Sequence, residues 1–131
     1  MKWERMNNNL EQLILRHLLV DEAFMRKVLP FIKPEYFQGV TRQLFLEVGK
    51  FVAKYNKLPT IDAFKIEIDQ SGRYNDDQYT AAMEMLPNIF DDVSKKADKD
   101  WLEDTTEKWC QDRAIHNAIM ESISIIDGKH Q

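Results

Sequence analysis

Cysteine and histidine side chains are few and widely spaced in this 131-residue chain. The only cysteine, Cys110, and the three histidines do not fall at the spacing of metal ligands, so the pattern predicts no metal site. Two pairs of adjacent acids, Asp76-Asp77 and Asp91-Asp92, lie beside a predicted helix start and in a linker-like stretch. Carboxylates in such places usually solvate the chain or face the positive end of a helix. We therefore predict no catalytic residue and no metal ligand.

Cofactor-binding motifs are also missing from the sequence. Four scattered glycines, Gly39, Gly49, Gly72 and Gly128, form neither a G-x-x-x-x-G-K-[ST] loop nor a G-x-G-x-x-G loop. His17 lies within an apolar helical stripe and has no second ligand spaced to join it, so we interpret it as a core residue. We predict no cofactor and no ATP turnover by this chain.

Charge is unevenly distributed along the sequence, whose formal net charge is −4. The chain up to residue 70 carries 11 basic and 9 acidic side chains, whereas the rest carries 7 and 13. The local excess of cations, Arg26, Lys27 and Lys33 with Arg16 nearby, forms no concentrated basic stripe. We interpret it as ordinary solvated helix faces, and we expect contact with DNA to be weak or indirect at most.

The sequence gives no sign of membrane insertion or secretion. No run approaches the 18 or so apolar residues that a membrane span needs, and the start MKWERMNNN lacks the apolar core of a secretory signal. Cys110 has no partner for an internal disulfide, which is typical of a reducing compartment. We expect a soluble cytoplasmic protein with no membrane partner.

Five short helices are predicted by apolar periodicity and by capping residues. We place their starts at Asn9, Asp21, Thr41, Thr60 and Asn75, because such side chains accept hydrogen bonds from the free backbone N–H groups of a first helical turn. No convincing strand pattern occurs. The sequence therefore predicts an all-α fold, in which a compact bundle of about five short helices precedes one long C-terminal helix.

An aromatic step between the second and third helices is predicted to belong to the core. Two prolines and a glycine bracket Phe31, Ile32, Tyr36 and Phe37 in this stretch. Side chains of this size usually contribute buried area. We expect all four to fill the space between neighbouring helices.

The last predicted helix, residues 98–127, decides the functional interpretation. Asp100 and Glu103 have the spacing of a capping box, and no glycine or proline follows before Gly128. At 1.5 Å per residue the helix is roughly 45 Å long, beyond the diameter expected of the preceding body. We predict that its apolar face pairs with another protomer or with a further segment; packing along its own domain is the alternative. The predicted interface residues are Leu102, Trp109, His116, Ile119, Met120, Ile123 and Ile126.

This interpretation divides the chain into four parts. We predict a flexible N-terminus at residues 1–8, a helical globular domain at 9–92, a long helix for subunit pairing at 93–127 and a tail at 128–131. The most linker-like segment is 88–97, because it holds adjacent acids and adjacent lysines without an apolar stripe.

Several segments, taken in order, resemble the N-terminal domain of DnaB-type replicative helicases and are most similar to the form found in T4-like bacteriophages. They are L-I-L-R-H-L-L-V-D ending at Asp21, K-P-E-Y-F from Lys33, L-P-T from Leu58, and W-L-E-D-T-T-E-K-W-C-Q-D-R from Trp101 to Arg113. The resemblance rests on their order and spacing. It implies a helical globule followed by a helical hairpin, and hairpins of neighbouring subunits pair in that family to form the collar of a hexameric ring.

The resemblance further implies contacts with a primase and a helicase loader, and a C-terminal ATP-dependent motor. This sequence contains neither the motor's P-loop nor the second arm of the hairpin, so no ATPase or strand-separating residue carries over. The implied function is that of a non-catalytic assembly domain of a phage replicative DNA helicase, in the host cytoplasm if a phage encodes it.

Other functions fit the same sequence. One is a stand-alone adaptor or inhibitor that binds a replicative helicase, and the helicase-binding domain of a primase belongs to the same class. Another is a small helical DNA-binding domain. A reading frame that continues into a G-x-x-x-x-G-K-[ST] motif would distinguish a piece of a helicase from a short protein.

Overall fold

In the computed structural model, residues 2–91 and 98–128 are described, without side chains for residues 2 and 3. The chain forms two compact units, residues 1–95 and residues 96–131. The predicted boundary at 92/93 and most of the predicted linker lie outside the described residues, as do the last three residues of the predicted tail. Each unit is helical, and the described residues contain no strand, so the predicted all-α class is confirmed.

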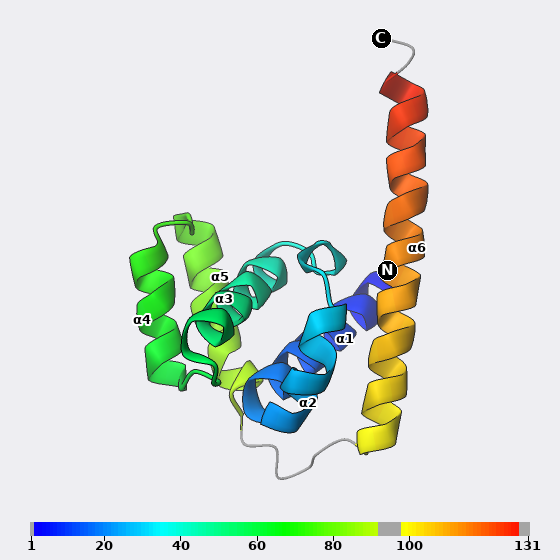
Figure 1. Ribbon diagram of the computed structural model, residues 1–131. Helices are drawn as coiled ribbons and strands as arrows, with labels where there is room; N and C mark the ends of the chain where they lie inside the picture. Colours follow the sequence, from blue (N-terminus) through cyan, green and yellow to red (C-terminus); the bar gives the residue numbers. More distant parts are fainter. Residues whose placement is uncertain (1, 92–97, 129–131) are drawn as a thin grey trace. The chain divides into compact units, whose positions relative to one another are not determined.

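The first unit is a bundle in which α1 contacts α2, α3 and α5, while α4 packs on α3 and α5 (Figure 1). Two short 3-10 turns, η1 and η2, connect α2 to α3. The elements are α1 Lys2–Val20, α2 Glu22–Val28, η1 Leu29–Phe31, η2 Pro34–Tyr36, α3 Val40–Tyr55, α4 Ile61–Ser71 and α5 Asp76–Ile89.

Three predicted helix starts are confirmed by their hydrogen bonds. Asp21 accepts from the backbone N–H of Phe24 at 3.1 Å, and Thr60 accepts from that of Ala63 at 3.1 Å. Asn75 and Gln78 form both bonds of a capping box at the start of α5. These bonds satisfy N–H groups that have no partner within the helix.

Two predicted starts are wrong. Helix α1 begins at Lys2 and not at Asn9, since no glycine or proline interrupts residues 2–9 and Asn7 bonds forward to Glu11 within the helix. Helix α3 begins at Val40, with Gly39 as its N-cap at φ 60°, a conformation that glycine adopts without strain.

The predicted cap of α3, Thr41, has a different role within the bundle. Its Oγ1 lies 3.0 Å from Glu11 Oε1 and 2.7 Å from the carbonyl oxygen of Gln38. The same carboxylate accepts from the backbone N–H of Gln38 at 2.7 Å and from the Asn7 amide at 3.1 Å. Glu11 is 1% exposed. It is therefore a buried acid whose hydrogen bonds join α1 to the start of α3, and such bonding offsets the cost of burying a carboxylate.

The core of the first unit consists of aliphatic and aromatic side chains from every helix of the bundle. The aromatic step contributes three of its four predicted members, while Phe31 is 73% exposed, so that part of the prediction is wrong. Phe37 stacks on Phe45, with ring centroids 4.8 Å apart. Side chains with 1% exposure or less include Ile14, Leu15, Leu18, Met25, Phe37, Leu44, Val48, Phe64, Ile68, Ala82, Leu86 and Ile89.

The second unit is one uninterrupted helix, α6 Lys99–Gly128 (Figure 1). Asp98 accepts from the backbone N–H of Trp101 at 3.0 Å, so Asp98 is the N-cap, and the predicted cap Asp100 lies inside the first turn. None of the described helices is long and apolar enough to cross a membrane.

Candidate protein interaction surfaces

Side-chain exposure differs strongly between the two halves of the long helix α6. The buried residues of α6 all lie in its first half: Leu102, Thr106, Trp109 and Arg113. From Ala118 to Gly128 every residue is exposed. Of the predicted interface residues, Leu102 and Trp109 are thus buried and His116 is half-buried. The exposed ones are Ile119 at 54%, Met120 at 51%, Ile123 at 47% and Ile126 at 57%.

The exposed apolar residues of the distal half form a stripe along the helix. Ile115, Ile119, Ile123 and Ile126 are spaced by four, four and three residues, which places them on one face. At about 100° per residue, these four isoleucines are centred roughly 115° around the helix from the four buried residues. The seven-residue spacing from Leu102 to Ile123 predicts one continuous face. A straight helix drifts about 20° per heptad from such a repeat, so the buried residues and the distal isoleucines lie on different faces.

The distal stripe is wide. With His116 and Met120 included, it covers about 140° of the helix circumference. A two-stranded coiled coil needs a narrower seam, whereas a face of at least 100° is typical of a helix packed in a bundle. We define the distal stripe as Ile115, His116, Ile119, Met120, Ile123 and Ile126.

Ile115, which is 60% exposed, was missing from the predicted interface. Its four-residue spacing to Ile119 was visible in the sequence and could have identified it. Ile125 is also exposed, at 55%, but it lies well outside the distal stripe on the same helix.

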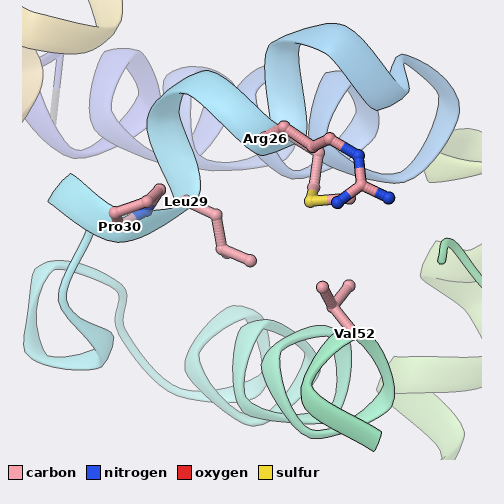
Figure 2. Close-up of a pocket in the computed structure, with 5 residues that line it drawn as sticks. Arg26, Leu29, Pro30 and Val52 are labelled. Carbon is pink, nitrogen blue, oxygen red and sulfur yellow. The ribbon is translucent and has the colours of Figure 1, made fainter. Parts of the chain in front are cut away.

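A second candidate surface is a hollow of about 220 Å³ in the first unit (Figure 2). Leu29 and Val52 approach each other across it from η1 and α3. The lining residues are Met25, Arg26, Leu29, Pro30 and Val52. The sequence did not predict this site, because its walls come from segments more than twenty residues apart.

The remaining chemistry-bearing residues are placed as follows. His17 is 2% exposed, its Nδ1 lies 2.9 Å from the carbonyl oxygen of Leu13, and its ring packs edge-on against Phe24. Burial, together with the nearby carboxylate of Glu107, raises the pKa of Cys110 to about 11. A thiol with a raised pKa is a poor nucleophile. Among the described residues, no cluster of three potential metal ligands occurs.

Comparison with known proteins identifies a relative of this chain. The chain is 30% identical over 115 residues to the DnaB-like replicative helicase of Enterobacteria phage T4. The match covers 87% of this chain but only 23% of that helicase. No family model matches the chain. The resemblance to DnaB-like helicases of the T4 type is therefore confirmed, for a region that spans about a quarter of the relative's length.

Proposed function

We propose that this chain, a relative of DnaB-like replicative helicases over most of its length, is a non-catalytic assembly domain that associates through the distal stripe of α6. Three observations support the proposal: the relationship to a T4-type helicase, the all-helical fold of the described residues and the absence of a P-loop from the sequence. The exposed isoleucines of α6 carry it, because a row of large apolar side chains on one helix face usually marks an interaction surface.

The width of the distal stripe bears on how α6 would associate. A face of about 140° is too broad to be covered by one partner helix and fits a groove between two helices. This is the environment of an arm in a bundle of paired helical hairpins, as the resemblance implies for the collar of a hexamer. We therefore propose that α6 pairs with α6 of another protomer, within a bundle that further helices complete.

Burial of the stripe provides the driving force. Fully burying an isoleucine side chain contributes roughly 1.5–3 kcal/mol, while association costs several kcal/mol of rigid-body freedom. A pair of α6 helices without further helices leaves part of each stripe in water. The isolated chain should therefore form a weak dimer, with a dissociation constant of about micromolar.

The experiment compares two identical substitutions on one helix. Ile123→Asp places a charge in the distal stripe, and Ile125→Asp places the same charge outside it on a residue of similar exposure, 55% against 47%. In sedimentation velocity over a concentration series, we expect Ile123→Asp to weaken the dimer at least about tenfold and Ile125→Asp less than about threefold. The double variant Ile119→Asp/Ile123→Asp should be monomeric with an unchanged unfolding midpoint.

A wild type that stays monomeric at high concentration contradicts the proposal. So does equal weakening by the two single variants, since that outcome would reflect the net charge and not the stripe.

The wider role, contact with a primase or a helicase loader during DNA replication, is the part of the proposal that rests on the relationship alone. It is tested by titrating the chain with the primase and the loader of the same replication system. Binding that survives Ile123→Asp would place these contacts elsewhere than on the stripe.

A further inference from the structure

We infer that the exposed, lysine-bearing face of α3 binds the acidic first half of α6 from a second copy of this chain. The contact is separate from the pairing of distal stripes, because it uses other residues and joins two unlike surfaces. It does not require the distal stripe to associate, so either proposal can fail without the other.

The side of α3 that faces away from the core carries positive charge. Lys50 and Lys54 are four residues apart, so they lie one above the other on the helix, and Leu46 continues the same row. This row is centred about 150° around the helix from the buried residues of α3. Both lysines are exposed, and Leu46 is 39% exposed. We define the basic face as Leu46, Lys50 and Lys54.

The first half of α6 carries the opposite charge on an exposed face. Asp100, Asp104 and Glu107 are spaced by four and three residues, which places them within about 60° of the helix circumference. All three acids are exposed, and Trp101, which lies one turn before Asp104, is 50% exposed. The three acids are centred roughly 90° around the helix from the four distal isoleucines. We define the acidic face as Asp100, Trp101, Asp104 and Glu107.

Each face holds like charges that are not neutralised by neighbouring side chains. Like charges four residues apart on a helix repel each other. Lys50 and Lys54 form such a pair on the basic face, and the acidic face has one in Asp100 and Asp104. Within the described ranges, 2–91 and 98–128, none of these four side chains forms an ion pair.

The helix dipole explains only part of this arrangement. Asp100 lies in the first turn of α6 and Lys54 in the last turn of α3, where their charges are favourable. The effect of the dipole falls off within one turn. It therefore does not account for Lys50, Asp104 or Glu107.

The two faces match in spacing as well as in charge. Two lysines four residues apart, like two aspartates four residues apart, are separated by about 6 Å along the helix axis. Two helices that lie side by side can therefore form both ion pairs at once. Trp101 adds an aromatic surface that can cover Leu46 of the other copy or contact a lysine through its ring.

A second copy fits the basic face better than nucleic acid does. Single strands bind without sequence preference where aromatic rings lie along a basic groove. The basic face has no aromatic residue, and Tyr55 lies about 100° around the helix from Lys54, packed on Phe51 with ring centroids 4.7 Å apart. Residues 98–107 of the same chain, in contrast, hold five acids and one lysine, so each copy carries a complement to the basic face.

The contact joins unlike surfaces, and such contacts continue from copy to copy instead of ending at a dimer. Exposed ion pairs are individually weak and are screened by salt. We expect a dissociation constant on the order of 1 mM for the free chain, so the contact is largely unoccupied at micromolar concentrations. If the distal stripes pair as proposed above, they hold the copies together at an effective concentration that can fill it.

The test uses the full chain with Ile119→Asp/Ile123→Asp, which removes pairing through the distal stripe. Backbone amide NMR spectra are recorded over a dilution series that starts at about 1 mM protein and low ionic strength. We expect concentration-dependent shifts in residues 46–57 and 98–108. Salt at about 0.5 M should reduce these shifts by at least about half.

Charge reversal on one face or on both separates a specific contact from an effect of net charge. Lys50→Glu/Lys54→Glu should reduce the concentration-dependent shifts at least about fourfold, which corresponds to a constant about tenfold weaker. Asp100→Lys/Asp104→Lys should do the same. A chain with all four substitutions keeps the original net charge and exchanges the signs of the two faces. It should recover at least about half of the shifts.

Matched controls place the same charge changes elsewhere. Lys27→Glu/Lys33→Glu and Glu121→Lys/Asp127→Lys lie at exposed positions outside the two faces, and they should reduce the shifts less than about twofold. Circular dichroism verifies that each variant is folded.

Four results each overturn the inference. The first is the absence of concentration-dependent shifts in the two segments, and the second is a four-substitution chain that associates no better than either reversed pair. The third is a set of shift changes after reversal that does not vary with concentration, which would place the contact within one chain. The fourth is a single-stranded oligothymidine that binds the basic face more tightly than the second copy does. The distal stripe is disabled in every sample, so none of these results bears on its pairing.

Discussion

The helices of residues 2–91 and the distal half of α6 carry similar apolar residues. Those residues form a buried core in the first region and are exposed to solvent in the second. Ile68 of α4 is 1% exposed because α4 packs on α3 and α5, whereas Ile123 of α6 is 47% exposed. Within the first unit, each helix packs against other helices of the same unit. In the distal half of α6, every residue from Ala118 to Gly128 is exposed. An amphipathic pattern therefore predicts that a face will be covered, but not by which chain.

The largest expected effect tests this difference with one substitution at two sites. Ile68→Ala should lower the free energy of unfolding by about 3 kcal/mol, because it removes buried methyl groups and leaves a cavity. Ile123→Ala should change it by less than about 0.5 kcal/mol at concentrations where the chain is monomeric. Urea denaturation followed by circular dichroism measures both. Equal losses would show that the distal stripe is covered within the same chain.

A second prediction concerns buried polar groups, which the first unit contains and the distal half of α6 lacks. Glu11→Ala should lower the free energy of unfolding by about 3 kcal/mol, since the backbone N–H of Gln38 and the buried side-chain amide of Asn7 lose their acceptor. Glu84→Ala, at an exposed position of α5, serves as the control and should change the free energy of unfolding by less than about 0.5 kcal/mol. If the two variants unfold at the same urea concentration, the carboxylate of Glu11 does not link α1 to α3.

The smallest effect compares the caps of the two units. Asn75→Ala removes both bonds of a capping box at the start of α5 and should cost about 1 kcal/mol of unfolding free energy. Asp98→Ala removes one cap bond at the start of α6 and should cost less, because the first turn of a long helix can fray without unfolding the rest. Amide hydrogen exchange measures protection in the first turns of α5 and α6 separately. Equal loss of protection after the two substitutions would contradict the prediction that the cap of α6 contributes less.

Local features of the fold could be predicted from the sequence. The caps Asp21, Thr60 and Asn75 each bond to an N–H three residues away, so their spacing is visible in the chain itself. The same reasoning failed at Thr41, because Glu11, thirty residues earlier, offers its hydroxyl another partner. It failed at Phe31 because size alone does not tell whether an aromatic ring faces the core or solvent.

The two candidate surfaces divide in the same way. The sequence alone determined the all-α class, the long terminal helix and most of the distal stripe, since these follow from periodicity within one element. Only the tertiary structure revealed the hollow, because Arg26 and Asn56 are thirty residues apart and their hydrogen bonds join α2 to the end of α3. It also decided which part of α6 is buried and which is exposed. Side-chain type and helical period fix a face, whereas its cover depends on contacts between distant segments, which no local pattern encodes.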